Sequence, residues 1–222
     1  MTLFLTVLQL MKLYGYWRSS AAYRVRIALH LKNQSFDSIP VHLVNNGGEQ
    51  HSSDYIALNP THLVPSFVDK ELTLNQSLAI IDYLDEKYPE VSVYPQNLAT
   101  KMQVKALAYD IACEIHPLNN LRVQQYLVQE LAVTDQQKTE WCYHWMGLGF
   151  SAIETKLAQT AGNYCFGDEI TLADICLVPQ VYNAKRINLD MSKYPLITRI
   201  VDNCNLLPAF INALPENQPD AL

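Results

Sequence analysis

The sequence predicts two domains of different class, a small α/β domain over residues 11–92 and an all-α helical domain over residues 98–222. Up to about residue 92, short β-type runs alternate with helical apolar periodicity in the order β-α-β-α-β-β-α. After the segment EVSVYPQN, the apolar pattern is that of long helices only. This division between the two patterns is the basis of the predicted fold class.

Composition excludes several functional classes. The chain has 222 residues, of which 49% are hydrophobic, so it can bury a sizeable core. Its net charge is -6 and its 16 Lys and Arg residues are scattered, which argues against a nucleic-acid partner. No apolar run approaches the roughly 18 to 20 residues of a membrane span. The five cysteines and six histidines lack disulfide or metal-ligand spacing. We therefore expect no metal site and a reducing, cytoplasmic location.

The first ten residues, MTLFLTVLQL, are apolar but differ from a secretory signal. No basic segment precedes the apolar run and no small-residue cleavage site follows it. Met11 then opens MKLYGYW, which alternates like a first strand. We expect Met11 to be the natural start and residues 1–10 to be an extension, which the intact mass of the native protein would test.

The elements of the first domain are read from periodicity and breakers. They are a strand at 12–17, a helix at 20–33, a strand at 36–44, a short helix in SSDYIALNP, an antiparallel strand pair in FVDKELTLN and a helix capped by Ser77. This order is that of the thioredoxin-like fold. Redox proteins of that fold carry C-x-x-C after the first strand, whereas this chain has Ser19-Ser20-Ala21-Ala22. Any sulfur bound there must therefore come from a ligand.

The helical domain is expected to begin with a helix from Leu98 into the 120s, kinked at Pro117. Thr134 and Gln137 form a capping box for a second helix, which ends before residue 162. Thr171 and Asp174 form a capping box for a third helix, with Asp in place of the usual Glu or Gln. One or two shorter helices complete the chain.

The serine pair at the start of the first helix has two interpretations. Either serine can cap the helix, and a hydroxyl at a helix N-terminus can also hold an anion such as a thiolate. We expect Ser20 or its neighbour to provide the cap and Ser19 to remain free to face a sulfur.

Two other segments would meet this turn in a thioredoxin-like fold. Pro65 either starts an edge strand or is a cis proline that presents the backbone of Val64 to a peptide. Ser77 either caps its helix or, with Gln76, binds a carboxylate. Together these features describe a groove for an extended, anionic thiol peptide, and glutathione fits that description.

The residues that carry a family resemblance lie in five segments, MKLYGYWRSSAAYRVRIAL, ALNPTHLVPSF, LNQSLAIIDYLDEKYP, IHPLNNLRVQQYL and GDEITLADICLVPQVYNAKR. In these segments the chain closely resembles the zeta class of glutathione transferases, whose best-known members are maleylacetoacetate isomerases. The resemblance runs from Met11 to the C-terminus and implies the glutathione-transferase fold.

The resemblance implies a role for each matching residue. Ser19, with Ser20, would stabilise the glutathione thiolate, and Arg186 would meet a substrate carboxylate with help from Arg24 or Arg122. Arg186 could instead be a surface charge at a helix end. The glutathione-binding residues would be Ser19, Ser20, Ala21, Ala22, Tyr23, Arg24, Gln50, Val64, Pro65, Gln76 and Ser77, bordered from the helical domain by His116, Asn120, Leu121 and Arg122.

The implied activity is cis-trans isomerisation of maleylacetoacetate to fumarylacetoacetate in tyrosine and phenylalanine catabolism. Glutathione thiolate would act as a reversible nucleophile, and the protein would be a homodimer acting on a small dicarboxylate. The chain departs from the family at Ala21, where a cysteine is usual, which puts the rate rather than binding in question. Two alternatives are a transferase that conjugates or dehalogenates small α-halo acids and a non-catalytic binding module.

Overall fold

The computed structural model describes residues 10–221. The chain forms two compact units, one made of residues up to 91 together with those from 211, and the other of residues 92–210. The expected extension at residues 1–10 lies, except for Leu10, outside the described residues. Each unit is considered by itself.

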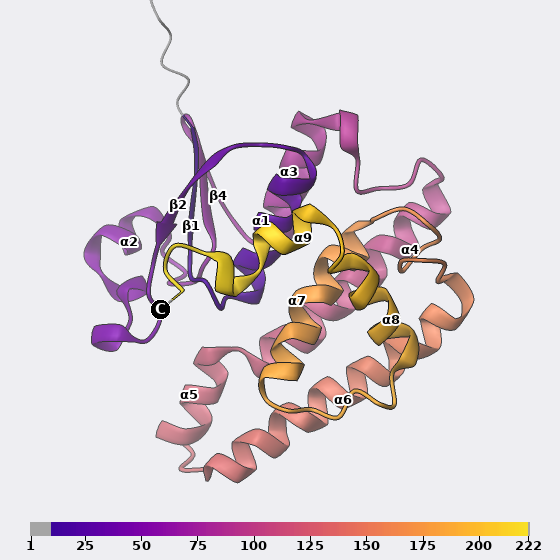
Figure 1. Ribbon diagram of the computed structural model, residues 1–222. Helices are drawn as coiled ribbons and strands as arrows, with labels where there is room; N and C mark the ends of the chain where they lie inside the picture. Colours follow the sequence, from indigo (N-terminus) through magenta and orange to yellow (C-terminus); the bar gives the residue numbers. More distant parts are fainter. Residues whose placement is uncertain (1–9, 222) are drawn as a thin grey trace, which may run out of the picture. The chain divides into compact units, whose positions relative to one another are not determined.

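The first unit contains a mixed four-stranded sheet in the order β2-β1-β3-β4. β1 is parallel to β2 and antiparallel to β3, and β3 and β4 form the expected antiparallel pair. Helices α1 and α3 lie on one face of the sheet and α2 on the other (Figure 1). The elements are β1 (Met11–Gly15), α1 (Ser20–Leu31), β2 (Phe36–Pro40), η1 (Asn45–Gly47), η2 (Glu49–His51), α2 (Ser53–Leu58), β3 (Ser66–Asp69), β4 (Leu72–Asn75), α3 (Ser77–Lys87) and η3 (Pro89–Val91).

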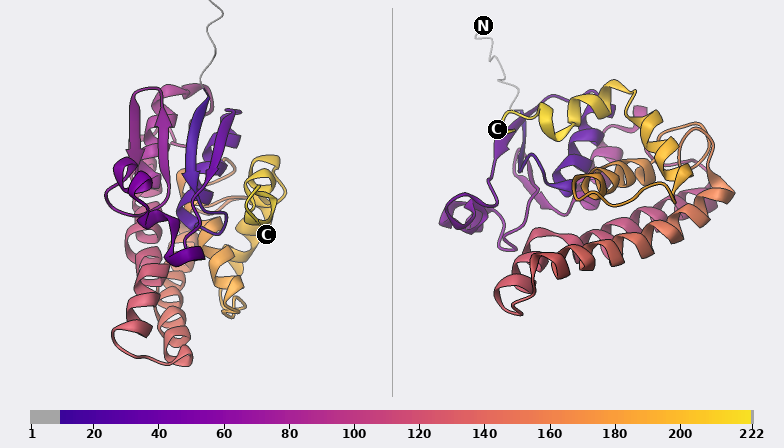
Figure 2. Two further views of the ribbon diagram at one scale, coloured as in Figure 1. Left: turned by 90° about the vertical axis from the view of Figure 1, so that its left-hand side faces the viewer. Right: turned by 60° about the horizontal axis from the view of Figure 1, so that its bottom comes forward.

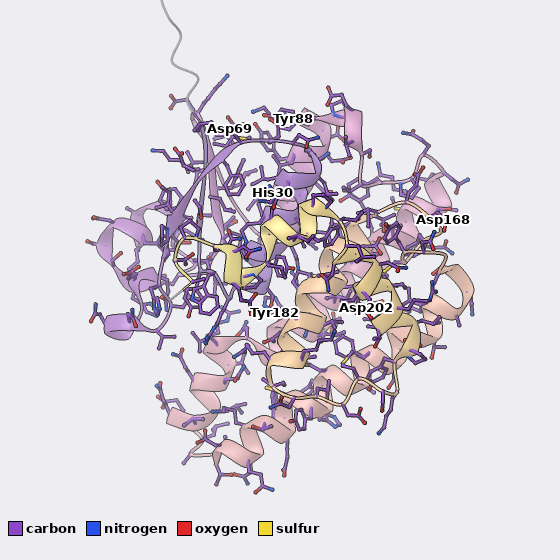
Figure 3. All side chains as sticks on the ribbon, viewed as in Figure 1. His30, Asp69, Tyr88, Asp168, Tyr182 and Asp202 are labelled. Atoms are coloured by element: carbon purple, nitrogen blue, oxygen red, sulfur yellow. The ribbon has the colours of Figure 1, made fainter. Side chains whose placement is uncertain are left out.

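The core of this unit follows from the apolar patterns. β1 buries Leu13, and α3 buries its apolar stripe of Ile80, Ile81 and Leu84, all at 0–2% exposure. α3 is also tied to the end of β3, because Asp69 (Figure 3) accepts hydrogen bonds from the Tyr83 hydroxyl at 2.7 Å and from Lys87. The strand predicted over 36–44 ends at Pro40, which has no N–H to continue a ladder.

The C-terminal segment groups with the first unit, whereas the sequence assigned all of 98–222 to a helical domain. The buried Arg26 donates to the carbonyl of Ala213 at 3.1 Å and to that of Trp17 at 3.0 Å. Asp220 accepts from the Trp17 amide at 3.0 Å. Arg26 and Ala213 are 187 residues apart in sequence, and Trp17 and Asp220 are 203 residues apart, so no local pattern predicts these two contacts.

The second unit is helical, with α6 as the longest helix of the described residues at 26 residues (Figure 2). The nearly fully buried α7 packs against α4 and α8. The elements are α4 (Leu98–Tyr109), the π-helical η4 (Asp110–Ile115), the 3₁₀ turn η5 (His116–Asn119), α5 (Leu121–Gln129), α6 (Asp135–Thr160), α7 (Leu172–Arg186) and α8 (Pro195–Cys204). The next helix, α9 (Pro208–Ala213), crosses the boundary at residue 211, and η6 (Pro215–Asn217) belongs to the first unit.

The helix expected to run from Leu98 into the 120s with a kink is instead broken into four pieces. Pro117 lies in the first turn of η5, where its missing N–H is tolerated. Asn119 donates its side-chain N–H to the carbonyl of Ile115 at 2.7 Å, and Asn120 then caps a new helix. The break therefore has its own hydrogen-bonding partners and is not a simple kink.

Both capping boxes are confirmed. The Thr134 amide donates to the Gln137 side chain at 2.8 Å, and the Gln137 amide donates back to the Thr134 hydroxyl at 3.2 Å. Asp174 accepts from the amide and the hydroxyl of Thr171, both at 2.8 Å, and from the Cys165 amide at 2.8 Å. Burial raises the pKa of Asp174 despite these donors. Among residues 10–221, no helix is long and apolar enough to cross a membrane.

Candidate functional site

The residues predicted for the site divide between the two units. The first unit holds Ser19, Ser20, Ala21, Ala22, Tyr23, Arg24, Gln50, Val64, Pro65, Gln76 and Ser77, and the second holds His116, Asn120, Leu121, Arg122 and Arg186. The two groups are described separately.

Ser19 is itself the N-cap of α1, which corrects the expectation that it would be free. It has extended backbone angles, and its Oγ accepts the amide of Ala22 at 3.2 Å. Ser20 is the first helical residue and is buried. A hydroxyl has two acceptor lone pairs and one hydrogen to donate, so capping leaves the O–H of Ser19 available. The cap therefore holds the hydroxyl at the helix start.

The start of α1 favours a negative charge. No acidic residue lies in its first turn, so the partial positive charge of the helix N-terminus is not offset there. Nearby, the Arg18 guanidinium stacks on the Trp17 ring at 4.1 Å from its centroid. Ala21, at the family's cysteine position, is half-buried in this turn. A ligand thiolate at the start of α1 would be stabilised by the Ser19 hydroxyl and by the helix N-terminus.

Ser77 is not the cap of α3 but its first residue, which corrects a second expectation. The N-cap is Gln76, whose φ is 67° and whose side chain makes no capping hydrogen bond. The hydroxyl of Ser77 instead accepts from Nη1 of Arg24 at 3.3 Å. The N–H groups that begin α3 thus lack a side-chain cap, and a cation lies beside them. This arrangement is suited to a carboxylate.

The Val64–Pro65 peptide bond is cis. This confirms the interpretation of Pro65 as a cis proline that presents the backbone of Val64. Within residues 10–221, neither the amide nor the carbonyl of Val64 has a hydrogen-bond partner. The carbonyl of Leu63 just before it accepts from the Tyr55 hydroxyl at 2.7 Å and the Asn59 side chain at 2.8 Å. Sequence reasoning missed Tyr55 and Asn59 as supports of this loop, because they act across a turn.

Gln50 follows a tight glycine turn and is 6% exposed. Its Oε1 has no partner in the described part of the chain, and its Nε2 lies 3.5 Å from the carbonyl of Leu43. Gly48 has a φ of 99°, and a Cβ there would lie 2.4 Å from the Gln50 side chain. Sequence reasoning also missed Gly48, whose lack of a side chain gives Gln50 its place.

In the second unit, Arg186 ends α7 with an exposed side chain. Its Nε and Nη2 donate to Oδ1 of Asn183 at 3.3 and 2.8 Å. Arg186 and Lys138 lie close enough to Cys142 to oppose the rise that burial produces in the pKa of that thiol. In the described chain Arg186 makes no ion pair, so its charge is available to an anion.

The other predicted residues of this unit lie in η5 and the start of α5. His116 begins η5 and is half-buried. Asn120 caps α5 by accepting the amide of Val123 at 3.1 Å. Leu121 and Arg122 are the first two residues of α5, and Arg122 is exposed.

The groups in the first unit fit glutathione, a tripeptide with one thiol and two carboxylates. The unpartnered Oε1 of Gln50, the unpartnered backbone of Val64 and the uncapped start of α3 can each bind a polar part of such a ligand. The O–H of Ser19 at the start of α1 can meet the sulfur.

Comparisons with known proteins match most of the chain. The model of the glutathione S-transferase N-terminal domain matches residues 13–92, and that of the C-terminal domain matches residues 146–208. The chain is 57% identical to a probable maleylacetoacetate isomerase of Vibrio cholerae, over 94% of this chain and 97% of that protein.

Two solved structures are similar over almost their whole length. A maleylpyruvate isomerase, described as a bacterial zeta-class glutathione S-transferase, is 41% identical with a TM-score of 0.91, covering 95% of this chain and 100% of its own. A maleylacetoacetate isomerase of Methylobacterium extorquens AM1, with bound malonate and glutathione, is 35% identical with a TM-score of 0.91. The match covers 95% of this chain and 99% of that protein.

Proposed function

The chain belongs to the zeta class of the glutathione S-transferase family, and we propose that it isomerises maleylacetoacetate to fumarylacetoacetate. It is an enzyme of the glutathione-dependent isomerase kind, and glutathione is its cofactor. The observation that carries the choice of substrate is the 57% identity, over nearly the whole chain, to a probable maleylacetoacetate isomerase. Tyrosine and phenylalanine breakdown is the pathway that suits this reaction.

When bound, glutathione supplies a thiolate that adds reversibly to the substrate double bond and so permits rotation. The part of Ser19 is to donate its hydroxyl hydrogen to that sulfur. A hydrogen bond to a charged group contributes about 1.5 to 3 kcal/mol, and a helix N-terminus adds about 0.3 to 1 kcal/mol. At about 1.36 kcal/mol per pKa unit, these lower a thiol pKa of about 8.5 by roughly two units.

The remaining groups position the two ligands. Gln50, the backbone of Val64, and Gln76 with Ser77 hold glutathione. Arg24 is 2% exposed and bound to Ser77, which argues for a role in holding that serine rather than in contacting substrate.

In the second unit, Arg186 takes a carboxylate of the substrate, and the exposed Arg122 is its candidate helper. A guanidinium suits this task because it is always charged and matches carboxylate geometry. The substrate is thus a small dicarboxylate, and the helical domain is its binding domain.

The deciding experiment follows the ultraviolet absorbance of maleylacetone, an analogue of the substrate, with substoichiometric glutathione. Complete conversion with glutathione recovered is the expected result and also shows that Ala21 is tolerated. If glutathione is instead consumed in proportion to an added α-halo acid, the result would favour conjugation or dehalogenation. Failure to bind glutathione would favour a non-catalytic module. If glutathione binds without turnover, Ala21→Cys is the first variant to make.

Maleylpyruvate is a second candidate substrate, favoured by the 41% identity to a solved maleylpyruvate isomerase. Both substrates are cis diacids, so the same thiolate and the same arginine would serve either. The ratio of kcat/KM for the two substrates, measured with one enzyme preparation, discriminates between them.

We further propose a cytoplasmic homodimer. All five cysteines are free thiols, as suits a reducing compartment. Leu98, Met102 and Tyr109 of α4 are 71%, 47% and 41% exposed and share one face of the helix, so a second copy would cover them. Sedimentation as a dimer at micromolar concentration, and as a monomer for Met102→Glu, is the expected outcome.

A further inference from the structure

A chain of buried amide groups leads to Arg186 within the second unit. Asn119 donates its Nδ2 to the carbonyl of Ile115 at 2.7 Å. Oδ1 of Asn119 accepts from Nδ2 of Asn183 at 2.8 Å. Oδ1 of Asn183 accepts from Nε and Nη2 of Arg186 at 3.3 and 2.8 Å. Two buried amide side chains thus connect a backbone carbonyl to an exposed guanidinium.

The direction of every bond in this chain is determined by its two ends. The carbonyl of Ile115 can only accept, and the guanidinium of Arg186 can only donate. Asn119 must therefore turn its nitrogen toward Ile115, which leaves its oxygen for Asn183. The amide of Asn183 must then turn its oxygen toward Arg186. Neither amide can flip without placing two donors or two acceptors against each other.

Burial makes this order costly to break. Asn119 is 2% exposed and Asn183 is 9% exposed, so water cannot readily replace a lost partner. Arg186 is the exposed end of this series of hydrogen bonds. The flexible side chain of Arg186 is thereby held through one edge of its guanidinium by the buried amide of Asn183.

From this arrangement, and resting on the function proposed above, we propose that Asn183 positions Arg186 for a substrate carboxylate and that Asn119 sets the orientation of Asn183. The edge bound by Asn183 is Nε–Nη2, which leaves Nη1 available to a carboxylate. Because the amide of Asn183 is neutral, the guanidinium keeps its full charge for the substrate. An acidic residue in this place would hold the arginine equally well but would compete with the carboxylate.

The same chain joins Arg186 to the segment that carries the other predicted residues of this unit. Ile115 ends η4, and Asn119 ends η5 directly before Asn120, the N-cap of the helix that carries Arg122. Buried hydrogen bonds thus join Arg186 to the segment that leads into α5. Pre-ordering such groups reduces the entropy that is lost when a ligand binds.

The test measures malonate binding by calorimetry to the glutathione-saturated protein, because a solved relative holds malonate together with glutathione. Asn183→Ala should weaken malonate binding roughly tenfold, the equivalent of one lost hydrogen bond to a charged group. Asn119→Ala should weaken it less, roughly threefold, because it acts through Asn183. The double variant should be no weaker than Asn183→Ala. Glutathione affinity should not change in any of them.

Gln180→Leu is the matched control. Gln180 is a fully buried amide on the same helix, and neither its oxygen nor its nitrogen has a partner among the described residues. Its loss should leave malonate affinity within about twofold. Thermal melting checks that each variant is folded.

The outcomes separate this proposal from the proposed function. A folded Asn183→Ala that binds malonate like the wild type overturns the positioning role, as do additive effects of Asn119 and Asn183 or an equal loss in Gln180→Leu. If the wild-type protein binds malonate with the expected variant pattern but does not isomerise maleylacetone, the proposed function fails while the positioning role is supported. With active wild type, KM for maleylacetone should rise in Asn183→Ala more than kcat falls.

Discussion

The Oγ of Ser19 lies 3.2 Å from the amide nitrogen of Ala22, so the serine expected to face sulfur also caps the helix that follows it. The two tasks use different parts of one hydroxyl, a lone pair for the amide and the hydrogen for an anion. Capping also restricts the rotation of the side chain, which leaves the O–H near the helix start. A change at Ser19 should therefore alter both stability and catalysis.

Ser19→Ala should lower turnover by roughly one to two orders of magnitude, because the thiolate loses a hydrogen-bond donor worth about 1.5 to 3 kcal/mol. It should also lower the free energy of unfolding by about 1 kcal/mol through the lost cap. Steady-state kinetics with maleylacetone and urea unfolding measure the two effects. Asn97→Ala removes the cap of α4, where Asn97 accepts from Thr100 at 3.1 Å, and should reproduce the instability without the loss of turnover. Equal turnover in Ser19→Ala would remove Ser19 from the mechanism.

Gly48→Ala should weaken glutathione binding roughly tenfold, because the new Cβ collides with the Gln50 side chain that we expect to hold the glycine end. Gly47→Ala is its matched control, since Gly47 also has a positive φ, of 82°, but nothing lies within 4 Å of its added Cβ. Both variants should lose about 1 kcal/mol of stability, while only Gly48→Ala should lose affinity. Calorimetric titration with glutathione measures the difference, and equal affinities would contradict it.

Ser77→Ala should weaken glutathione binding roughly tenfold while kcat at saturating glutathione changes little. The substitution removes a hydroxyl from the start of α3 and also a hydrogen-bond partner of the buried Arg24. A parallel loss of kcat would indicate that Ser77 acts on the reacting atoms. Titration and steady-state kinetics on one preparation distinguish the two cases.

The link between Asp69 and Lys87 predicts a stability profile with two limbs. Burial would raise the pKa of Asp69, but hydrogen bonds from Lys87 and Tyr83 outweigh it and hold that pKa below its usual value. Burial alone would lower the pKa of Lys87, but the hydrogen bonds of Lys87 with Asp69 and Tyr83 outweigh this effect and raise that pKa above its usual value.

An acid whose folded pKa is lowered adds stability above its unfolded pKa of about 4, and a base whose folded pKa is raised adds stability below its unfolded pKa of about 10.4. Lys87→Met should therefore cost about 1 kcal/mol near pH 7. The difference from the wild type should shrink as the pH falls through the folded pKa of Asp69 or rises above the normal range of lysine. Urea unfolding at several pH values measures this, and a constant difference would contradict it.

Local chemistry made much of this protein predictable from sequence. The capping boxes at Thr134 and Thr171 depend on residues three positions apart, and the strand and helix order depends on apolar spacing. The serine pair and the Gln76-Ser77 segment were identified by the same local rules. The motif resemblance added the residues of the helical domain, which no local rule would assign to a site.

Short segments of the sequence indicate which residues can begin helices and which can meet an anion, because these properties depend on local chemistry. The folded structure was needed to show that Ser19 rather than Ser20 is the cap, and that Ser77 binds Arg24 instead of capping α3. It also decided the path from Ile115 to Arg186 and the place of the C-terminal segment beside Arg26. These contacts join residues far apart in the chain, and such pairs are selected by packing and burial rather than by spacing.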